Sequence, residues 1–201
     1  MIKKLPLSLL LVLTSTLSVG SIAGTLAKPH SFGVNIASGG IEFNNSDYDG
    51  DGVAQIYGFY NYAFTDQLSL EVGLNIGADV DDWDCYEDRD DDWHCSTNKD
   101  SSLFGLNVDE VEYTNLVTAI KGVIPLSQRN SLYGKVGAQF YDYELSRHNR
   151  AVFEDNGVGL YLAAGWQYEW DMGIGMNVGL EKYDMGNLES TVLSVGINYH
   201  F

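Results

Sequence analysis

The residue types best suited to chemistry gather in one acidic stretch, Asp81 to Cys95 (DDWDCYEDRDDDWHC). It holds eight acidic residues and both cysteines of the chain, Cys85 and Cys95, together with His94. Thiolates and imidazole suit zinc, whereas carboxylates suit calcium or magnesium. In an exported chain the default for two cysteines is a disulfide, which removes both thiolates as ligands. We therefore predict a Cys85–Cys95 disulfide in a solvated, self-repelling loop. Weak Ca²⁺ or Mg²⁺ association and a redox switch are the alternatives.

A second acidic motif, Asp47 to Gly52 (DYDGDG), begins like a calcium-binding EF-hand loop, with Asp47, Asp49 and Asp51 at alternate positions. An EF-hand requires a bidentate glutamate at its twelfth position, and here that position is Gly58. The motif also leads into a run typical of a strand, where an EF-hand has a helix. We expect at most weak calcium binding by these three aspartates, with no confident metal site and no cofactor.

The first residues predict a secretory signal peptide. Lys3 and Lys4 form a basic start, Leu5 to Leu13 is almost wholly apolar, and small residues follow. The expected signal peptide spans residues 1–23, with cleavage after residue 27 as the alternative. Residues 28–201 then form a single domain that leaves the cytoplasm.

The composition excludes several classes of function. The 201-residue chain has a formal net charge of −17, which repels nucleic acid, and no basic patch offsets it. After the signal peptide, no apolar stretch reaches the ~18 residues that a transmembrane helix needs. With 22 glycines, 13 tyrosines and only 3 prolines, the chain favours strands over helices.

Apolar and polar residues alternate along the chain with a period of two, which indicates strands. From Leu68 to Asp79, leucine, valine and isoleucine share one face, while serine, glutamate, asparagine and glycine share the other. Met172 to Tyr183 and Thr191 to Phe201 repeat this pattern. Five further segments fit less cleanly: Phe32 to Phe43, Val53 to Phe64, Val111 to Ile124, Leu132 to Tyr143 and Gly157 to Trp170.

These eight strands are long enough to cross a bilayer, which takes ~9–11 residues. Tight turns alternate with longer polar connections, which are expected at Asn44 to Gly52, Asp81 to Glu110 and Glu144 to Asn156. If the aliphatic and aromatic face points outward and the glycine, amide and charged face inward, the outside must be lipid. The sequence therefore predicts an all-β, eight-stranded antiparallel up-and-down transmembrane barrel. The alternative is a secreted soluble barrel of the lipocalin type, with the two faces reversed.

Four charged residues fall on the predicted inner face: Glu71, Lys121, Lys135 and Glu181. Charges in such an interior must be paired, so we expect a polar network that stabilises the lumen. A gated ion path is the alternative function of the same residues. A general diffusion pore is disfavoured, because porins use ~16 strands or more.

The alternating segments also resemble a known family. Pro125 to Gln139, Gly159 to Asp184 and the final run SVGINYHF are similar to the OmpA/OmpX-like family of small outer-membrane barrels. The resemblance implies short periplasmic turns, long extracellular loops and integral location in the outer membrane of a Gram-negative cell. It also implies that Tyr199 and Phe201 form the signal read by the outer-membrane assembly machinery. The implied partners are outer-membrane lipid and lipopolysaccharide, with no nucleic acid.

Such patterns identify architecture better than activity. We expect a non-enzymatic protein that serves envelope integrity or surface interaction, such as adhesion to an extracellular or host ligand, through its acidic loops. The first alternative is a lipid-modifying enzyme, because lipid A deacylase barrels use a His-x-Ser pair and His94-Cys95-Ser96 has that spacing. That triplet lies in the hydrophilic stretch and not on a lipid-facing strand. A narrow ion channel is the second alternative.

Overall fold

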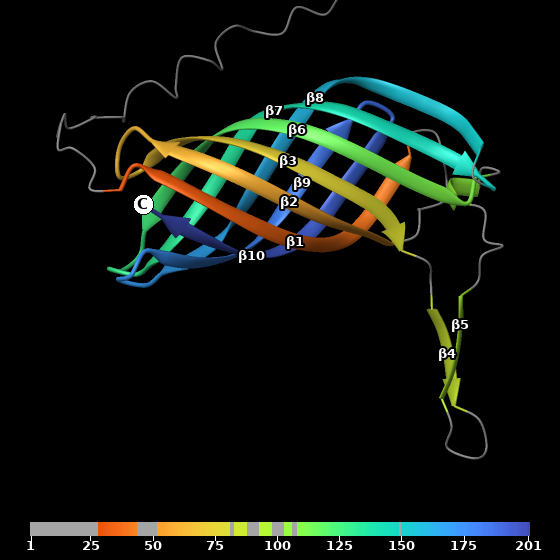
Figure 1. Ribbon diagram of the computed structural model, residues 1–201, viewed down its shortest axis with the longest axis horizontal. Coiled ribbons are helices and arrows are strands. Elements are labelled where there is room, and N and C mark those ends of the chain that lie inside the picture. Colours follow the sequence, from red (N-terminus) through yellow and green to blue (C-terminus); the bar gives the residue numbers. More distant parts are fainter. Residues whose placement is uncertain are drawn as a thin grey trace, which may run out of the picture.

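The chain forms a closed antiparallel barrel in the computed structural model, which describes residues 28–43, 52–80, 83–87, 93–97, 103–105, 108–148 and 150–201 (Figure 1). The barrel strands are β1 (His30–Phe43), β2 (Gly52–Ala63), β3 (Leu68–Val80), β6 (Glu110–Pro125), β7 (Asn130–Arg147), β8 (Arg150–Glu169), β9 (Ile174–Met185) and β10 (Leu188–His200). Around the barrel the order is β1-β10-β9-β8-β7-β6-β3-β2, so each barrel strand pairs with the barrel strands before and after it in the chain, and β1 closes onto β10. This confirms the predicted eight-stranded up-and-down barrel.

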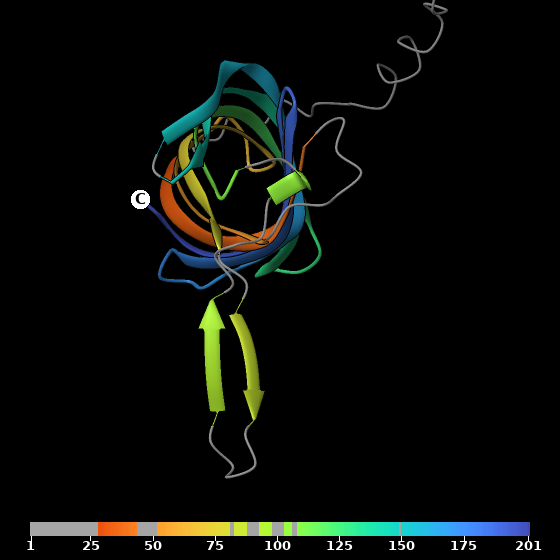
Figure 2. The ribbon, with the colours of Figure 1, turned by 90° about the vertical axis from the view of Figure 1, so that its right-hand side faces the viewer.

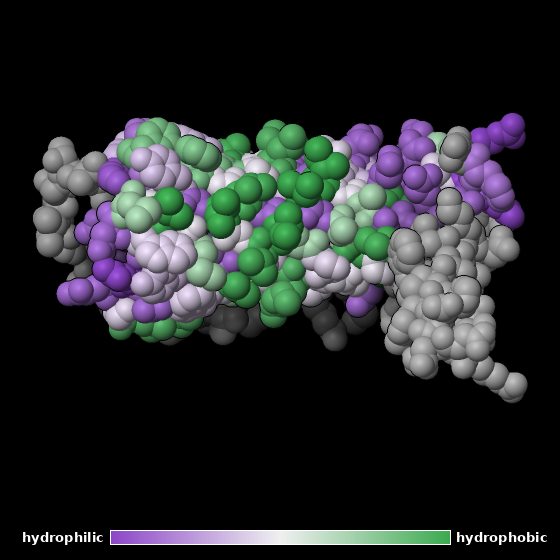
Figure 3. Space-filling view, turned by 60° about the horizontal axis from the view of Figure 1, so that its bottom comes forward, coloured by the Kyte–Doolittle hydropathy of each residue, from purple (hydrophilic) through white to green (hydrophobic). Residues whose placement is uncertain are grey.

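The two faces of the strands point as the transmembrane prediction requires. Ile36 and Ile124 on the outside are 64% and 65% exposed, whereas Asn75 and Gln139 on the inside are fully buried. The exposed aliphatic side chains form a band around the middle of the barrel, with polar residues at both ends (Figure 3). A soluble barrel would need the reverse arrangement, so the lipocalin-type alternative is wrong.

The two ends of the barrel differ. One end, here called the turn end, carries the tight connections 64–67, 126–129 and 170–173. Arg129 in one of these turns forms an ion pair of 2.5 Å with Asp171 in the next turn along the chain. The hydrogen bonds that the guanidinium donates to Tyr168 and to Asp171 raise its pKa. The opposite end, here called the loop end, carries the connections between β1 and β2 and between β3 and β6. Among the described residues, no helix is long and apolar enough to cross a membrane.

The connection predicted at Glu144 to Asn156 is wrong. β7 continues to Arg147 and β8 begins at Arg150, so almost the whole segment is paired strand. Its inward positions, such as Leu145 and Phe153, alternate with outward glutamates, which is a strand pattern for a sheet that faces water. The charged residues that suggested a loop therefore belong to the parts of β7 and β8 that extend beyond the apolar band. In Figure 1, β7 and β8 extend further toward the loop end than the β9–β10 hairpin.

The segment between β3 and β6 contains more regular structure than a loop. β4 (Trp83–Glu87) and β5 (Trp93–Thr97) form a separate two-stranded antiparallel sheet, and a short 3₁₀ turn, η2, spans Leu103–Gly105. The predicted signal peptide and the predicted calcium ligands Asp47, Asp49 and Asp51 lie outside the described residues.

Candidate functional site

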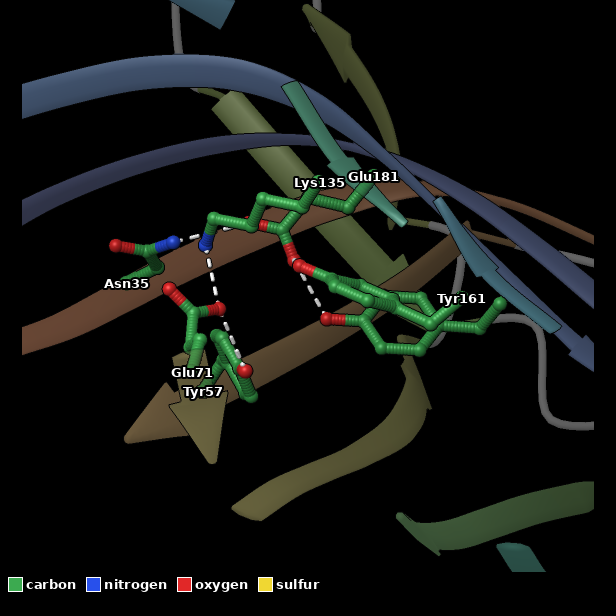
Figure 4. A network of polar contacts seen from close by, with 7 residues as sticks. Asn35, Tyr57, Glu71, Lys135, Tyr161 and Glu181 are labelled. Atoms are coloured by element: carbon green, nitrogen blue, oxygen red, sulfur yellow. Dashed lines mark hydrogen bonds and ion pairs between the residues drawn. The ribbon is translucent and has the colours of Figure 1, made fainter. Parts of the chain in front are cut away.

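The centre of the lumen holds a buried ion pair. The Nζ of Lys135 on β7 lies 2.7 Å from Oε1 of Glu71 on β3, and both side chains are almost completely buried. The hydroxyl of Tyr57 on β2 donates to the same carboxylate oxygen at 2.8 Å (Figure 4). The ammonium also lies 4.9 Å from the ring centroid of Phe59. The ion pair and the tyrosine hydrogen bond therefore join three strands in a buried, low-dielectric interior.

A second buried carboxylate, Glu181 on β9, is held by neutral donors. Asn35 Nδ2 donates to its Oε1 at 2.9 Å, while the hydroxyls of Tyr183 and Tyr161 donate to its Oε2 at 2.5 and 3.3 Å. Asn35, Tyr161 and Glu181 point into the same part of the lumen as the Lys135–Glu71 pair (Figure 4). Among the described residues no cation lies within ion-pair distance of Glu181, so its direct partners are neutral hydrogen-bond donors.

The structure places all four predicted lumenal residues on the inner face but does not bring them all into contact. Glu71 and Lys135 are paired, whereas Lys121 lies opposite Lys135 in the β6–β7 register and its ammonium stacks 5.0 Å from the ring of Tyr133. The tyrosine donors and Asn35 were missed. The alternation along the strand could have identified one of them. Tyr57 is an odd number of residues from the outward-facing Tyr60 and Tyr62, so its side chain must point inward.

Apolar side chains close the lumen toward the loop end. Phe104 of η2 is buried and packs on Phe43 with ring centroids 5.6 Å apart, although its backbone φ of 57° is one that side chains rarely adopt. Seen along the barrel from this end, η2 lies at one side of the opening (Figure 2). The surrounding buried residues are Ile41, Val53, Leu103, Val108, Val111, Leu145, Met185 and Leu188. The described part of the lumen is therefore filled rather than open to the outside.

Several buried polar atoms of the lumen have no protein partner among the described residues. They include Glu71 Oε2, Asn75 Oδ1, Gln139 Oε1 and both side-chain polar atoms of Asn115. Buried polar groups are nearly always hydrogen-bonded, and internal water is the usual partner where protein atoms are lacking. We therefore expect ordered water molecules between the inner polar side chains, below the apolar closure.

The outer face of the sheet beyond the apolar band is acidic. Glu112 on β6 lies directly opposite Glu144 on β7, and Glu144 lies directly opposite Glu154 on β8. Among the described residues, none of the three forms an ion pair; Glu144 accepts a hydrogen bond of 2.8 Å from Ser146. Like charges directly opposite on neighbouring strands destabilise a sheet. We call Glu112, Glu144 and Glu154 the glutamate row.

Glu110 extends this acidic surface at the start of β6. Partial desolvation, followed by repulsion from Glu112, Asp79, Asp109 and Glu144, raises the pKa of its carboxyl above the usual value. A raised folded-state pKa means that protonation of this group favours the folded barrel. Its contribution to stability is present below the unfolded-state pKa and is lost as the pH rises through the folded-state pKa.

Replacement of Glu110 by glutamine is therefore expected to raise the free energy of unfolding at pH 7 by less than about 1 kcal/mol, since water near the surface screens the repulsion at this partly buried group. At a pH below 4 the gain should disappear. Urea unfolding of the reconstituted barrel at both pH values measures this, with Asp66→Asn at the turn end as a control of equal charge change. An equal gain at both pH values would contradict the assignment.

The predicted disulfide has a compatible backbone register. Cys85 on β4 lies directly opposite Cys95 on β5, and opposed positions in an antiparallel pair bring Cα atoms to about 4.5–5.5 Å, within the range for a disulfide. The disulfide itself stays a prediction. His94 lies opposite Tyr86 in the same hairpin.

The predicted assembly signal lies at the turn end. Tyr199 and Phe201 stack with ring centroids 6.3 Å apart, and Phe32 contacts both rings from β1. These aromatic residues face outward near the edge of the apolar band, as expected at a membrane interface. Recognition by an assembly machinery stays a prediction.

Comparison with known proteins supports the architecture. The family model of the outer membrane protein beta-barrel domain matches residues 9–201. The fold is similar to that of Ail, the attachment invasion locus protein of Yersinia pestis, in complex with the heparin analogue sucrose octasulfate; identity is 15%, coverage 86% of this chain and 97% of Ail, and the TM-score 0.55. It is also similar to Neisserial surface protein A, with 12% identity, coverage of 86% and 97%, and a TM-score of 0.61.

A third similar structure is the N-terminal β-barrel domain of Pseudomonas aeruginosa OprF, with 12% identity, coverage of 84% and 97%, and a TM-score of 0.50. At these identities the structures show a shared fold and nothing finer. No curated protein matches the sequence.

Proposed function

Because the chain belongs to the family of outer membrane protein β-barrel domains, we propose that it is a non-enzymatic protein whose loop end contacts ligands outside the cell. The barrel is integral to the outer membrane, and by family topology its loop end faces the exterior and its turn end the periplasm. We include envelope integrity in the same proposal, since the described part of the lumen is filled and leaves no open path through it.

The observation that carries the proposal is the closed lumen. The Glu71–Lys135 pair and the tyrosine-bound Glu181 fill its centre, and the apolar residues around Phe104 close it toward the exterior. With the interior closed, the surface beyond the apolar band is the part of the barrel that remains available to partners. That surface is ordered sheet rather than loop along β7 and β8, which suits a binding surface because it needs no ordering on contact.

The charge of this surface favours cationic partners. Ail, of similar fold, has been crystallised with a heparin analogue, which is a polyanion. In this chain the glutamate row and the net charge of −17 would repel a polyanion. We therefore infer that the ligands are proteins or surfaces with exposed basic groups, and that the binding falls as ionic strength rises.

Attachment of cells that display the barrel to immobilised basic and acidic extracellular proteins tests this function. We expect attachment to the basic proteins, lost at high salt, and none to heparin. In parallel, purified barrel in planar bilayers should show no porin-like conductance, and the lipid A of expressing cells should keep its full set of acyl chains. Loss of an acyl chain would replace the proposal with the deacylase alternative, and stable conductance steps would replace it with the channel.

A further inference from the structure

One edge of the sheet remains unpaired at the loop end. Of β8, only Tyr161 to Glu169 pairs with β9, although the strand begins at Arg150. β9 ends at Met185 and returns directly into β10 at Leu188, so it does not reach the first half of β8. In the described part of the chain, Arg150 to Val158 therefore pairs on one side only, with β7, and a β-bulge at Val152 interrupts that pairing between Ala151 and Phe153. We call this segment the open edge; it belongs to the strand pair that extends furthest in Figure 1.

The open edge is held in an extended conformation by its inner face. The ring of Phe153 lies 6.0 Å from that of Tyr143 and 6.1 Å from that of Phe43, which in turn packs on Phe104. The edge is therefore anchored to the apolar closure of the lumen. Beyond the bulge, from Phe153 to Val158, alternate residues present a backbone N–H and C=O to a further strand, and these groups are preorganised to accept one.

The side chains beside the open edge select the charge of such a strand. Glu154 projects from the edge strand itself, and Glu144 and Glu112 continue the glutamate row behind it. A strand added to β8 would place its outward side chains next to Glu154, within reach of a cross-strand contact. A second copy of this chain, paired edge to edge, would bring another acidic edge against the first. The row therefore disfavours self-association and favours lysine or arginine in the added strand.

We propose that the open edge binds an extended basic segment of another protein as an additional antiparallel strand. Backbone hydrogen bonds to Phe153–Val158, the regular part of the open edge, supply affinity, and alternate basic side chains of the segment pair with the glutamate row. This inference rests on the proposed surface function and names the chemistry of the partner.

The test uses the full barrel in phosphatidylcholine nanodiscs and a fluorescent peptide of alternating lysine and valine. We expect saturable binding by fluorescence anisotropy, with none to empty nanodiscs and none for the matching glutamate–valine peptide. The variant Glu144→Gln/Glu154→Gln should bind the lysine peptide about 2- to 30-fold more weakly, the range expected for two exposed ion pairs. The control Glu42→Gln/Asp66→Asn carries the same charge change away from the open edge and should bind as the unaltered barrel does.

A second peptide separates strand addition from simple charge attraction. With proline at the valine positions the peptide keeps its charge but loses half of its backbone donors, so we expect binding at least about tenfold weaker. Isotope-edited infrared spectra of the bound lysine–valine peptide should show antiparallel pairing. Equal binding of the proline peptide, or unchanged binding by the Glu144→Gln/Glu154→Gln variant, would overturn the inference. If the peptides fail while displaying cells still attach to basic proteins, the inference falls and the proposed function stands.

Discussion

Replacement of Lys135 by methionine is expected to lower the free energy of unfolding of the barrel by about 3–5 kcal/mol. Methionine has nearly the volume of the lysine side chain, so the change removes the charge without creating a large cavity. What remains is the carboxylate of Glu71, completely buried, with the hydroxyl of Tyr57 as its one remaining donor among the described residues. An uncompensated buried charge is among the most destabilising single changes known.

Urea unfolding of barrels folded into lipid vesicles, followed by the heat-dependent shift in gel mobility, measures this loss. The double variant Glu71→Gln/Lys135→Met should recover most of the stability, because it removes both charges together. Lys121→Met is the matched control: Lys121 is a lumenal lysine that forms no ion pair with the described residues, so its loss should cost much less. If the single Lys135 variant is no less stable than the double, Glu71 does not depend on Lys135.

Strand periodicity alone was sufficient to predict which way Glu71, Lys135 and Glu181 point, but not which of them meet. Alternation assigns a face, whereas contact depends on register across several strands. In the strand pairing, Ser69 on β3, Lys121 on β6 and Lys135 on β7 lie side by side in one row. Glu71 is the next inward-facing residue of β3 after Ser69, so Lys135 can reach it. No local pattern in the sequence encodes that row. Polar donors from aromatic residues, such as Tyr183 to Glu181, were overlooked for the same reason.

The error at Glu144 to Asn156 has a different cause. A segment rich in charged residues indicates contact with solvent. In a membrane barrel such a segment is readily interpreted as a loop, because the membrane-spanning strands are apolar on their outer face. Here the sheet continues into water, and the apolar residues that hold it, such as Phe153 and Leu145, contact the lumen closure rather than lipid. The open edge follows from an asymmetry in hairpin length between β7–β8 and β9–β10, which becomes apparent only once the strands are paired.

Glycines on the inner face of the strands leave room in the lumen for the large side chains of their neighbours. Eight strands enclose little space, and here tyrosines, glutamines and charged side chains must share it. Glycine lies where another group already occupies the position of a side chain: a Cβ on Gly73 would lie 2.5 Å from the hydroxyl of Tyr57, the donor to Glu71. On the outer face the same residue type has no such role, since a Cβ on Gly58 would meet nothing within 4 Å.

Alanine at Gly137 is therefore expected to destabilise the barrel by about 1–3 kcal/mol or more, whereas alanine at Gly58 should be neutral or stabilise it by up to about 1 kcal/mol. The Cβ of alanine at 137 would lie 2.6 Å from Cα of Ala119 and still closer to the carbonyl oxygen of Thr118. Both are backbone atoms of β6, paired directly with β7, and cannot turn aside as a flexible side chain would. Urea midpoints of the two variants in the same vesicles give the comparison. Equal midpoints would contradict this explanation, because they would mean that the backbone of β6 leaves room for a side chain at position 137.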